Sequence, residues 1–203
     1  MHKFANTTEL LIYALGTVEQ AVNSLWRDVK ICLKSEIEPA PTPAILFCFS
    51  TINLLGALVT GRADRRANNK EISIYYMTCF MHYSIENATI LIDLFRHKLV
   101  HLAQPSPWIR YDSEQITWKH HHDDRQFHLR RIPLEQGSEI GGDVPSHWHI
   151  PVTHQFNISI KDLARDIKLS ATGSNGYYDL LGHSPYLQAK YELAINQMYG
   201  EST

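Results

Sequence analysis

Arginine and histidine side chains gather near residue 100, where a predicted helix ends. Arg96, His97 and His101 follow a series of apolar residues spaced by three and four, and Pro105 comes soon after. This spacing is typical of an amphipathic helix over residues 84–102, with the three polar side chains on its last turns. Histidine can accept or donate a proton near neutral pH, and arginine grips phosphate oxygens through a planar fork. The pattern suits metal-independent RNA cleavage, which needs a base for the 2′-hydroxyl, a cation for the phosphorane and an acid for the leaving 5′-oxygen.

The geometry of a regular helix limits how these groups can cooperate. Asp93 lies one turn before Arg96 and His97, so its carboxylate can orient either of them. On an ideal helix Arg96 and His101 point about 140° apart, at 100° per residue. They can meet if the last turn loosens, or if two copies of the chain face each other across a two-fold axis. A simpler interpretation is a charged helix end, in which cations offset the helix dipole.

The spacing from Arg96 to His101, with a polar residue directly after the arginine, resembles the R-x4–6-H motif of the HEPN superfamily. Many members of that superfamily are metal-independent ribonucleases, and their helical domains dimerise. The resemblance implies a composite site in a dimer cleft, where His101 is the base or acid, Arg96 binds phosphate and His97 fills the polar position. It covers residues 1–105. Nuclease toxins of the superfamily often have a tyrosine two residues after the histidine, where this sequence has Ala103.

Two further features are candidates for RNA contact. The predicted loop 61–70 carries four cations, Arg62, Arg65, Arg66 and Lys70. They suit phosphate contacts, although a solvated loop would look the same. Trp108 follows the motif and can stack on a base, although most tryptophans pack in a core or a seam.

The chain has 12 histidines, many of them between residues 97 and 154. On a strand, His147 and His149 would place two imidazoles on one face, as metal ligands often lie. With Gly141 they match the opening of the cupin motif G-x5-H-x-H, but the expected glutamate and the second cupin motif are missing. We therefore expect no metal and no cofactor, and a histidine-rich hairpin that packs on the helices or contacts RNA. A histidine-rich metal-binding protein is the third hypothesis.

Composition indicates a soluble globular protein of 203 residues, with 44% hydrophobic residues and a net charge of −2. Any RNA contact must then be local, since the chain as a whole is not basic. Cys32, Cys48 and Cys79 are predicted to be reduced thiols in the core of a cytoplasmic protein. The N-terminus has no continuous apolar region of a secretory signal. The apolar run 44–59 is interrupted by polar residues, so we expect a core helix and no membrane span.

Hydrophobic periodicity predicts four helices before Pro105 and a β-hairpin after it. The predicted elements are helices over residues 7–32, 42–60, 71–83 and 84–102, a hairpin over 115–121 and 125–132, a helix from 159 to 172, and a last helix from 185. The expected fold is mainly α: a HEPN-like four-helix up-and-down bundle over residues 1–105, followed by a β-hairpin and two C-terminal helices in residues 106–203. The two parts are expected to form one compact unit.

The leading functional hypothesis is a homodimeric, metal-independent endoribonuclease of HEPN type, such as a toxin or defence effector with RNA as substrate and an antitoxin as partner. The alternative is a non-catalytic HEPN dimer that binds RNA, nucleotide or a protein partner. Ala103 favours this alternative.

Overall fold

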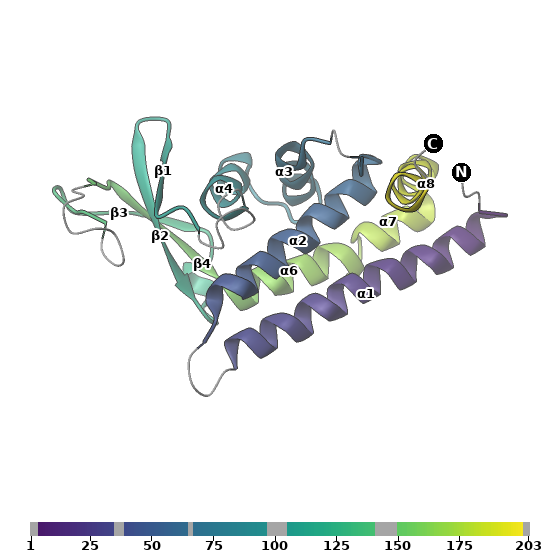
Figure 1. The fold of residues 1–203 in the computed structure, drawn as a ribbon, viewed down its shortest axis with the longest axis horizontal. Coiled ribbons are helices and arrows are strands. Elements are labelled where there is room, and N and C mark those ends of the chain that lie inside the picture. The colour runs from purple at the N-terminus through teal and green to yellow at the C-terminus, as the bar shows by residue number, and fades with distance from the viewer. Residues whose placement is uncertain (1–3, 35–38, 65–66, 97–104, 141–149, 201–203) are drawn as a thin grey trace.

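The fold joins a layer of long helices to a small mixed sheet. The computed structural model describes residues 4–34, 39–64, 67–96, 105–140 and 150–200. Its helices are α1 (Thr7–Leu33), α2 (Pro41–Thr60), α3 (Asn69–Cys79), α4 (Ile85–Leu91), the π-helix η1 (Ile92–Arg96), the 3-10 helix η2 (Arg125–Phe127), α6 (Ile160–Thr172), α7 (Tyr177–His183) and α8 (Pro185–Tyr199). Its strands are β1 (Trp108–Tyr111), β2 (Glu114–His121), β3 (Arg130–Pro133) and β4 (His154–Ser159). Figure 1 shows the sheet at one end of the layer, opposite the end where α8 and the start of α1 lie.

The helices α1 and α2 form the base of the hydrophobic core. In α1 the spacing of three and four predicts one apolar face, and the structure buries four residues of that face, Val18, Val22, Leu25 and Val29. The other three predicted residues, Leu11, Leu15 and Cys32, are half-buried, and Leu10 and Ala14 are buried instead. α2 is apolar and long enough to cross a membrane by length and composition, and 61% of its most apolar window is buried inside the protein. Residues such as Ile45, Phe49, Ile52 and Leu55 of α2 are buried in the core, as expected of a core helix.

Two glycines shape the surroundings of α2. Gly61 ends the helix at φ 68°, a left-handed conformation that glycine adopts without a steric penalty, and its role as the helix stop was predicted. Gly56 lies against the backbone of α3, where an added Cβ would stand 2.5 Å from the carbonyl oxygen of Ile72. A glycine is therefore needed for α3 to approach α2 this closely.

The sheet has the strand order β1-β2-β4-β3. β1 and β2 are antiparallel, β2 and β4 are parallel, and β3 pairs with β4 in the antiparallel sense. Phe156 and Ile158 of β4 and Ile116 of β2 are fully buried and belong to the same hydrophobic core as the helices. The sheet is therefore built into the core at one end of the helical layer.

The expectation of a mainly α fold with an appended hairpin is wrong, because the chain has an α/β fold with a four-stranded mixed sheet. The two segments predicted as hairpin partners do not pair, since β4 lies between β2 and β3. Residues 154–159, which form β4, were not predicted as a strand. Without that segment, two alternating stretches close in sequence look like a hairpin, whereas a parallel pair depends on a partner far along the chain.

The C-terminal helices complete the core beside α1 and α2. Ser159 caps α6 as its spacing from Asp162 predicted. The hydroxyls of Tyr76 in α3 and Ser170 in α6 are 2.9 Å apart, and those of Thr17 and Tyr191 are 3.0 Å apart. These contacts tie the C-terminal helices to helices of the first hundred residues.

The three cysteines are all free thiols but do not share one environment. Cys48 is buried, Cys32 is half-buried and Cys79 is exposed at the end of α3. The expectation of a core position is therefore wrong for Cys79, because α3 ends there and the next residues turn away toward α4.

Candidate functional site

The helix that carries the Arg–His motif changes its geometry just where the motif begins. Ser84 caps α4, accepting a hydrogen bond from the backbone N–H of Asn87 at 3.1 Å. After one α-helical stretch the backbone widens into η1, a π-helix over Ile92–Arg96. Single π turns are rare, and many lie at functional sites. Arg96 is the last residue of this turn, while His97 and His101 lie outside the described residues.

Asp93 contacts a cation from another element. Its carboxylate oxygen Oδ1 lies 2.5 Å from the ammonium nitrogen of Lys70, at the start of α3. Both side chains are partly exposed, at 36% and 45%. The contact therefore brings the predicted basic loop, which ends at Lys70, to the helix that carries the motif.

The predicted RNA-binding cations of this loop are only partly described. Arg62 forms an ion pair of 3.3 Å with Glu71, and Arg65 and Arg66 lie outside the described residues. A shallow pocket of about 340 Å³ adjoins the loop, lined by Arg62 and by Asn53 of α2 among others. No residue of α4 or η1 lines this pocket, so Lys70 is the described residue through which the loop contacts the motif helix.

The chain after the motif helix returns to it before entering the sheet. The backbone N–H of Ser106 donates to the carbonyl of Leu94 in η1 at 2.7 Å, and the indole N–H of Trp118 donates to the carbonyl of Ser106 at 2.8 Å. The ring of Trp118 meets Phe95 of η1 edge-on, with centroids 5.0 Å apart. Trp108, the other predicted RNA contact, is half-buried at the start of β1.

The histidines of β2 do not form a metal centre among the described residues, where no group of three or more metal-ligating side chains occurs. His120 stacks on His122 with centroids 5.9 Å apart, and burial followed by the nearby histidines lowers the pKa of His120. His121 is bonded to Asn157 at 3.1 Å. His147 and His149, the candidate metal ligands, lie outside the described residues.

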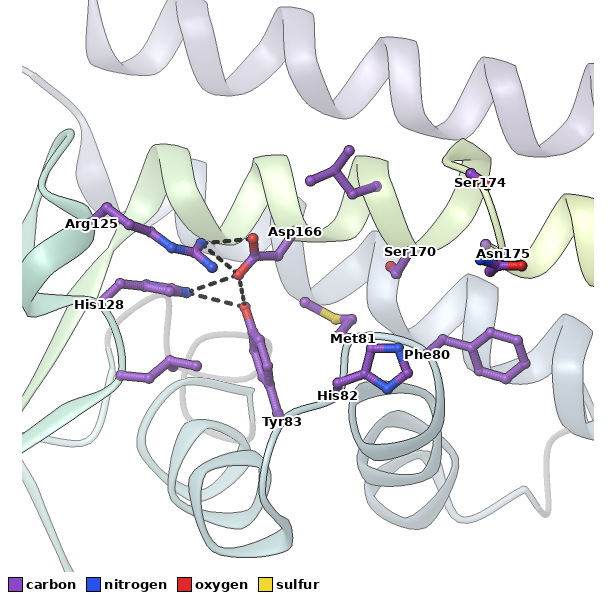
Figure 2. A pocket seen from close by; sticks show the side chains of 13 residues that line it. Phe80, Met81, His82, Tyr83, Arg125, His128, Asp166, Ser170, Ser174 and Asn175 are labelled. Atoms are coloured by element: carbon purple, nitrogen blue, oxygen red, sulfur yellow. Dashed lines mark hydrogen bonds and ion pairs between the residues drawn. The ribbon is translucent and has the colours of Figure 1, made fainter.

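The structure also brings together four residues that sequence reasoning did not single out as a site. Tyr83 precedes α4, Arg125 begins η2, His128 follows η2, and Asp166 lies in α6. Figure 2 shows these side chains meeting at one end of a pocket. They come from three segments that lie far apart in the chain, because Arg125 and His128 both belong to η2 and its C-cap, so no spacing in the sequence could have indicated that the three segments meet. His128 was predicted to lie on a hairpin strand.

The hydrogen bonds of this cluster converge on the carboxylate of Asp166. The backbone N–H of Ser159 donates to Nδ1 of His128 at 3.1 Å, which leaves the ring proton on Nε2. That Nε2 lies 3.1 Å from the hydroxyl oxygen of Tyr83 and 3.5 Å from Oδ2 of Asp166. The Tyr83 hydroxyl donates to the same Oδ2 at 2.8 Å, and Nη1 of Arg125 donates to both carboxylate oxygens at 2.7 and 2.8 Å. Asp166 is thus surrounded by donors.

The pKa values of the cluster follow from these contacts. Burial alone would raise the pKa of Asp166, but the hydrogen bonds from His128, Arg125 and Tyr83 outweigh it and hold this pKa below its ordinary value. Burial and the adjacent carboxylate raise the pKa of Tyr83 well above its ordinary value. The carboxylate is therefore anionic and the phenol protonated near neutral pH.

The pocket beside this cluster has a volume of about 520 Å³. Its walls are the turn between α3 and α4, the segment around η2, and the end of α6 with the loop after it. His82, Leu129 and Asn175, one from each wall, have φ of 56°, 60° and 60°. They are three of the four non-glycine residues with positive φ in the described part of the chain. Such conformations cost free energy and cluster at functional sites.

Comparisons of the chain with protein-family models, with curated proteins and with solved structures find no match.

Proposed function

We propose that this protein is a metal-independent endoribonuclease of HEPN type that acts as a homodimer. His101 serves as base or acid, Arg96 holds the scissile phosphate, and His97 fills the polar position between them. The 2′-hydroxyl attacks phosphorus while its proton passes to the base, and the bond to the 5′-oxygen breaks as the acid protonates it. The products are a 2′,3′-cyclic phosphate and a 5′-hydroxyl.

The observation that carries this proposal is the π turn of η1, which ends at Arg96. The π turn leads directly into the motif, and a regular α-helix would point the side chains of Arg96 and His101 about 140° apart. The motif therefore begins where the helix departs from the geometry that would separate its two groups. The proposal concerns this motif and does not depend on the four-helix bundle, which the fold lacks.

Cations near the motif helix also support the proposal. The ion pair between Lys70 and Asp93 places the end of the basic loop beside η1, and the partly exposed ammonium of Lys70 is a cation near the motif for an RNA backbone. Asp93 was expected to orient Arg96 or His97. Its bond to Lys70 gives it a second role, which is to position the loop.

The test is RNA degradation by the purified protein in EDTA. Wild-type protein should cut RNA and leave cyclic-phosphate and 5′-hydroxyl ends, and Arg96→Ala and His101→Ala should each lose activity with the fold retained. Arg130→Ala, an exposed arginine on β3, is the matched control and should cut as wild type does. Wild-type protein that is inert toward every RNA class would overturn the proposal.

A mixing experiment tests the shared site. If each site takes Arg96 from one subunit and His101 from the other, mixing the two inactive variants restores one intact site in each heterodimer. Random exchange makes about half of the dimers heterodimers, so activity should return to about a quarter of the wild-type value. No recovery despite proven subunit exchange would show that the two groups act within one subunit.

The second candidate is a non-catalytic dimer that binds RNA, nucleotide or a protein partner. Ala103 favours it, because nuclease toxins of the superfamily often have tyrosine at that position. RNA binding without cleavage, unchanged in His101→Ala, would support this candidate over the first.

A further inference from the structure

We propose that the pocket between the α3–α4 turn, η2 and the end of α6 binds a small phosphate-bearing ligand of nucleoside monophosphate size. Arg125 is its anion contact. The pocket is built from different residues than the Arg–His motif, so this inference goes beyond the proposed ribonuclease function and does not need it.

The size and lining of the pocket suit a ligand with a ring at one end and an anionic group at the other. Its volume of about 520 Å³ lies within the range of small-molecule sites. Phe80 and Leu169 contribute apolar and aromatic surface, and Ser174 and Asn175 contribute polar groups. Figure 2 shows Phe80, Ser174 and Asn175 together at the end of the pocket opposite Arg125. A base can pack at that end while a phosphate reaches the guanidinium.

Arg125 is held in place for an anion. Both of its bonds to Asp166 use the same nitrogen, Nη1, which also lies 3.9 Å from Oδ1 of Asp162, so these contacts do not use Nη2 or Nε. The side chain is 60% exposed, whereas the carboxylate beneath it is 11% exposed. A guanidinium fixed by one arm loses less freedom when it binds a phosphate, and charge-assisted bonds to phosphate are the strong ones.

The same geometry argues against a cation in this pocket. Asp166 is the only carboxylate among the residues that line it. Its oxygens already accept from Arg125 and Tyr83, and His128 Nε2 lies 3.5 Å away. A metal ion or an ammonium group would have to displace these donors. The guanidinium of Arg125 is therefore the charged group that a ligand can reach.

Three residues that line the pocket have backbone conformations that cost free energy. His82, Leu129 and Asn175 adopt positive φ in three different segments that converge on this pocket. Asparagine and histidine tolerate that conformation better than other residues, but for leucine it is unusual. Because strained backbone conformations cluster at functional sites, three of them around one pocket support a binding role for it.

The test is calorimetric titration of the full chain with AMP, GMP, CMP and UMP. The titration uses the Arg96→Ala/His101→Ala double variant, so that the motif cannot account for binding and failure here is separate from failure of the ribonuclease proposal. At least one nucleotide should bind, and the matching nucleoside should bind at least about tenfold more weakly because it lacks the charged contact. If none of the four nucleotides binds, the proposal is wrong. Equal affinity for inorganic phosphate would overturn the nucleoside assignment.

Substitutions in the pocket test whether the nucleotide binds there. Arg125→Met should weaken binding by about tenfold or more, and Arg130→Met, which removes an exposed arginine from β3, should leave it unchanged. Because Arg125→Met leaves Asp166 without its cation, Arg125→Met/Asp166→Asn is made as well, which removes both charges and keeps an acceptor for Tyr83. Asn175→Gly keeps the left-handed turn and removes one polar contact, so it should also weaken binding. Unchanged affinity in the folded Arg125 variants would place the ligand elsewhere and contradict the proposal.

Discussion

The hydroxyl of Tyr83 donates a hydrogen bond to Asp166 over 2.8 Å, and 83 positions separate the two residues in the sequence. Tyr83 stands directly before Ser84, the residue that caps α4. The bond therefore fixes the start of the helix that carries the Arg–His motif to α6. Beyond η1 the chain is fixed a second time, by the bond from Ser106 to Leu94.

Removing the Tyr83 hydroxyl should destabilise the protein. In Tyr83→Phe, Asp166 loses one of its donors in a largely buried position, and His128 loses the contact of its Nε2. We expect the free energy of unfolding to fall by about 1–3 kcal/mol, measured by urea denaturation. Tyr199→Phe, at a position that is 72% exposed, should change it very little. Equal stability of the two variants would mean that the network adds nothing to the fold.

The stability of the protein should fall in acid partly through Asp166. Because its pKa in the folded protein is below the ordinary value of 3.8, the carboxylate stabilises the fold at pH values above about 4 and loses this effect as the pH falls through the folded pKa. Asp166→Asn should lower the free energy of unfolding at neutral pH, and the difference from wild type should shrink below about pH 4. Denaturation in urea over a pH series measures this. Glu19→Gln, on the exposed face of α1, is the control and should leave the curve unchanged. A difference that stays constant down to about pH 2 would contradict the assignment.

Position 82 should prefer glycine to alanine. His82 is exposed with φ of 56°, and a residue with a Cβ pays about 1 kcal/mol in that conformation. Both substitutions remove the imidazole, so His82→Gly should be more stable than His82→Ala by about that amount. At Glu19, inside α1, the order should reverse, since glycine costs about 1 kcal/mol relative to alanine in a helix. The same order at both positions would show that the backbone at His82 is not strained.

Loss of the Lys70 charge should affect RNA binding more than stability. The ion pair with Asp93 is partly exposed on both sides, so Lys70→Ala should cost less than about 1 kcal/mol of unfolding free energy. If the loop contacts the RNA backbone, the slope of log affinity against log salt should decrease by about 0.7 for one lost contact with a single strand. Lys168→Ala, an exposed lysine on α6, is the control. An unchanged slope in Lys70→Ala would remove the loop from the proposed RNA surface.

The sequence by itself determined the positions of most helices. The apolar spacing in α1 was enough to predict Val18, Val22, Leu25 and Val29 as buried, because a helix repeats every 3.6 residues and one face must meet the core. Gly61 and Ser159 marked a helix end and a helix start through local backbone chemistry. The end of α3 was predicted four residues too late, because no residue type near position 82 marks the left-handed turn at His82.

Only the tertiary structure decided the sheet and the pocket. Phe156 and Ile158 alternate with polar residues as in a strand, but only the structure shows that β4 pairs with β2 and β3, because parallel pairing joins segments far apart in the chain. The contact of Tyr83, Arg125, His128 and Asp166 has the same origin. Nothing within any one of their segments marks these residues as a site, and their shared hydrogen bonds form only once folding has brought the three segments together.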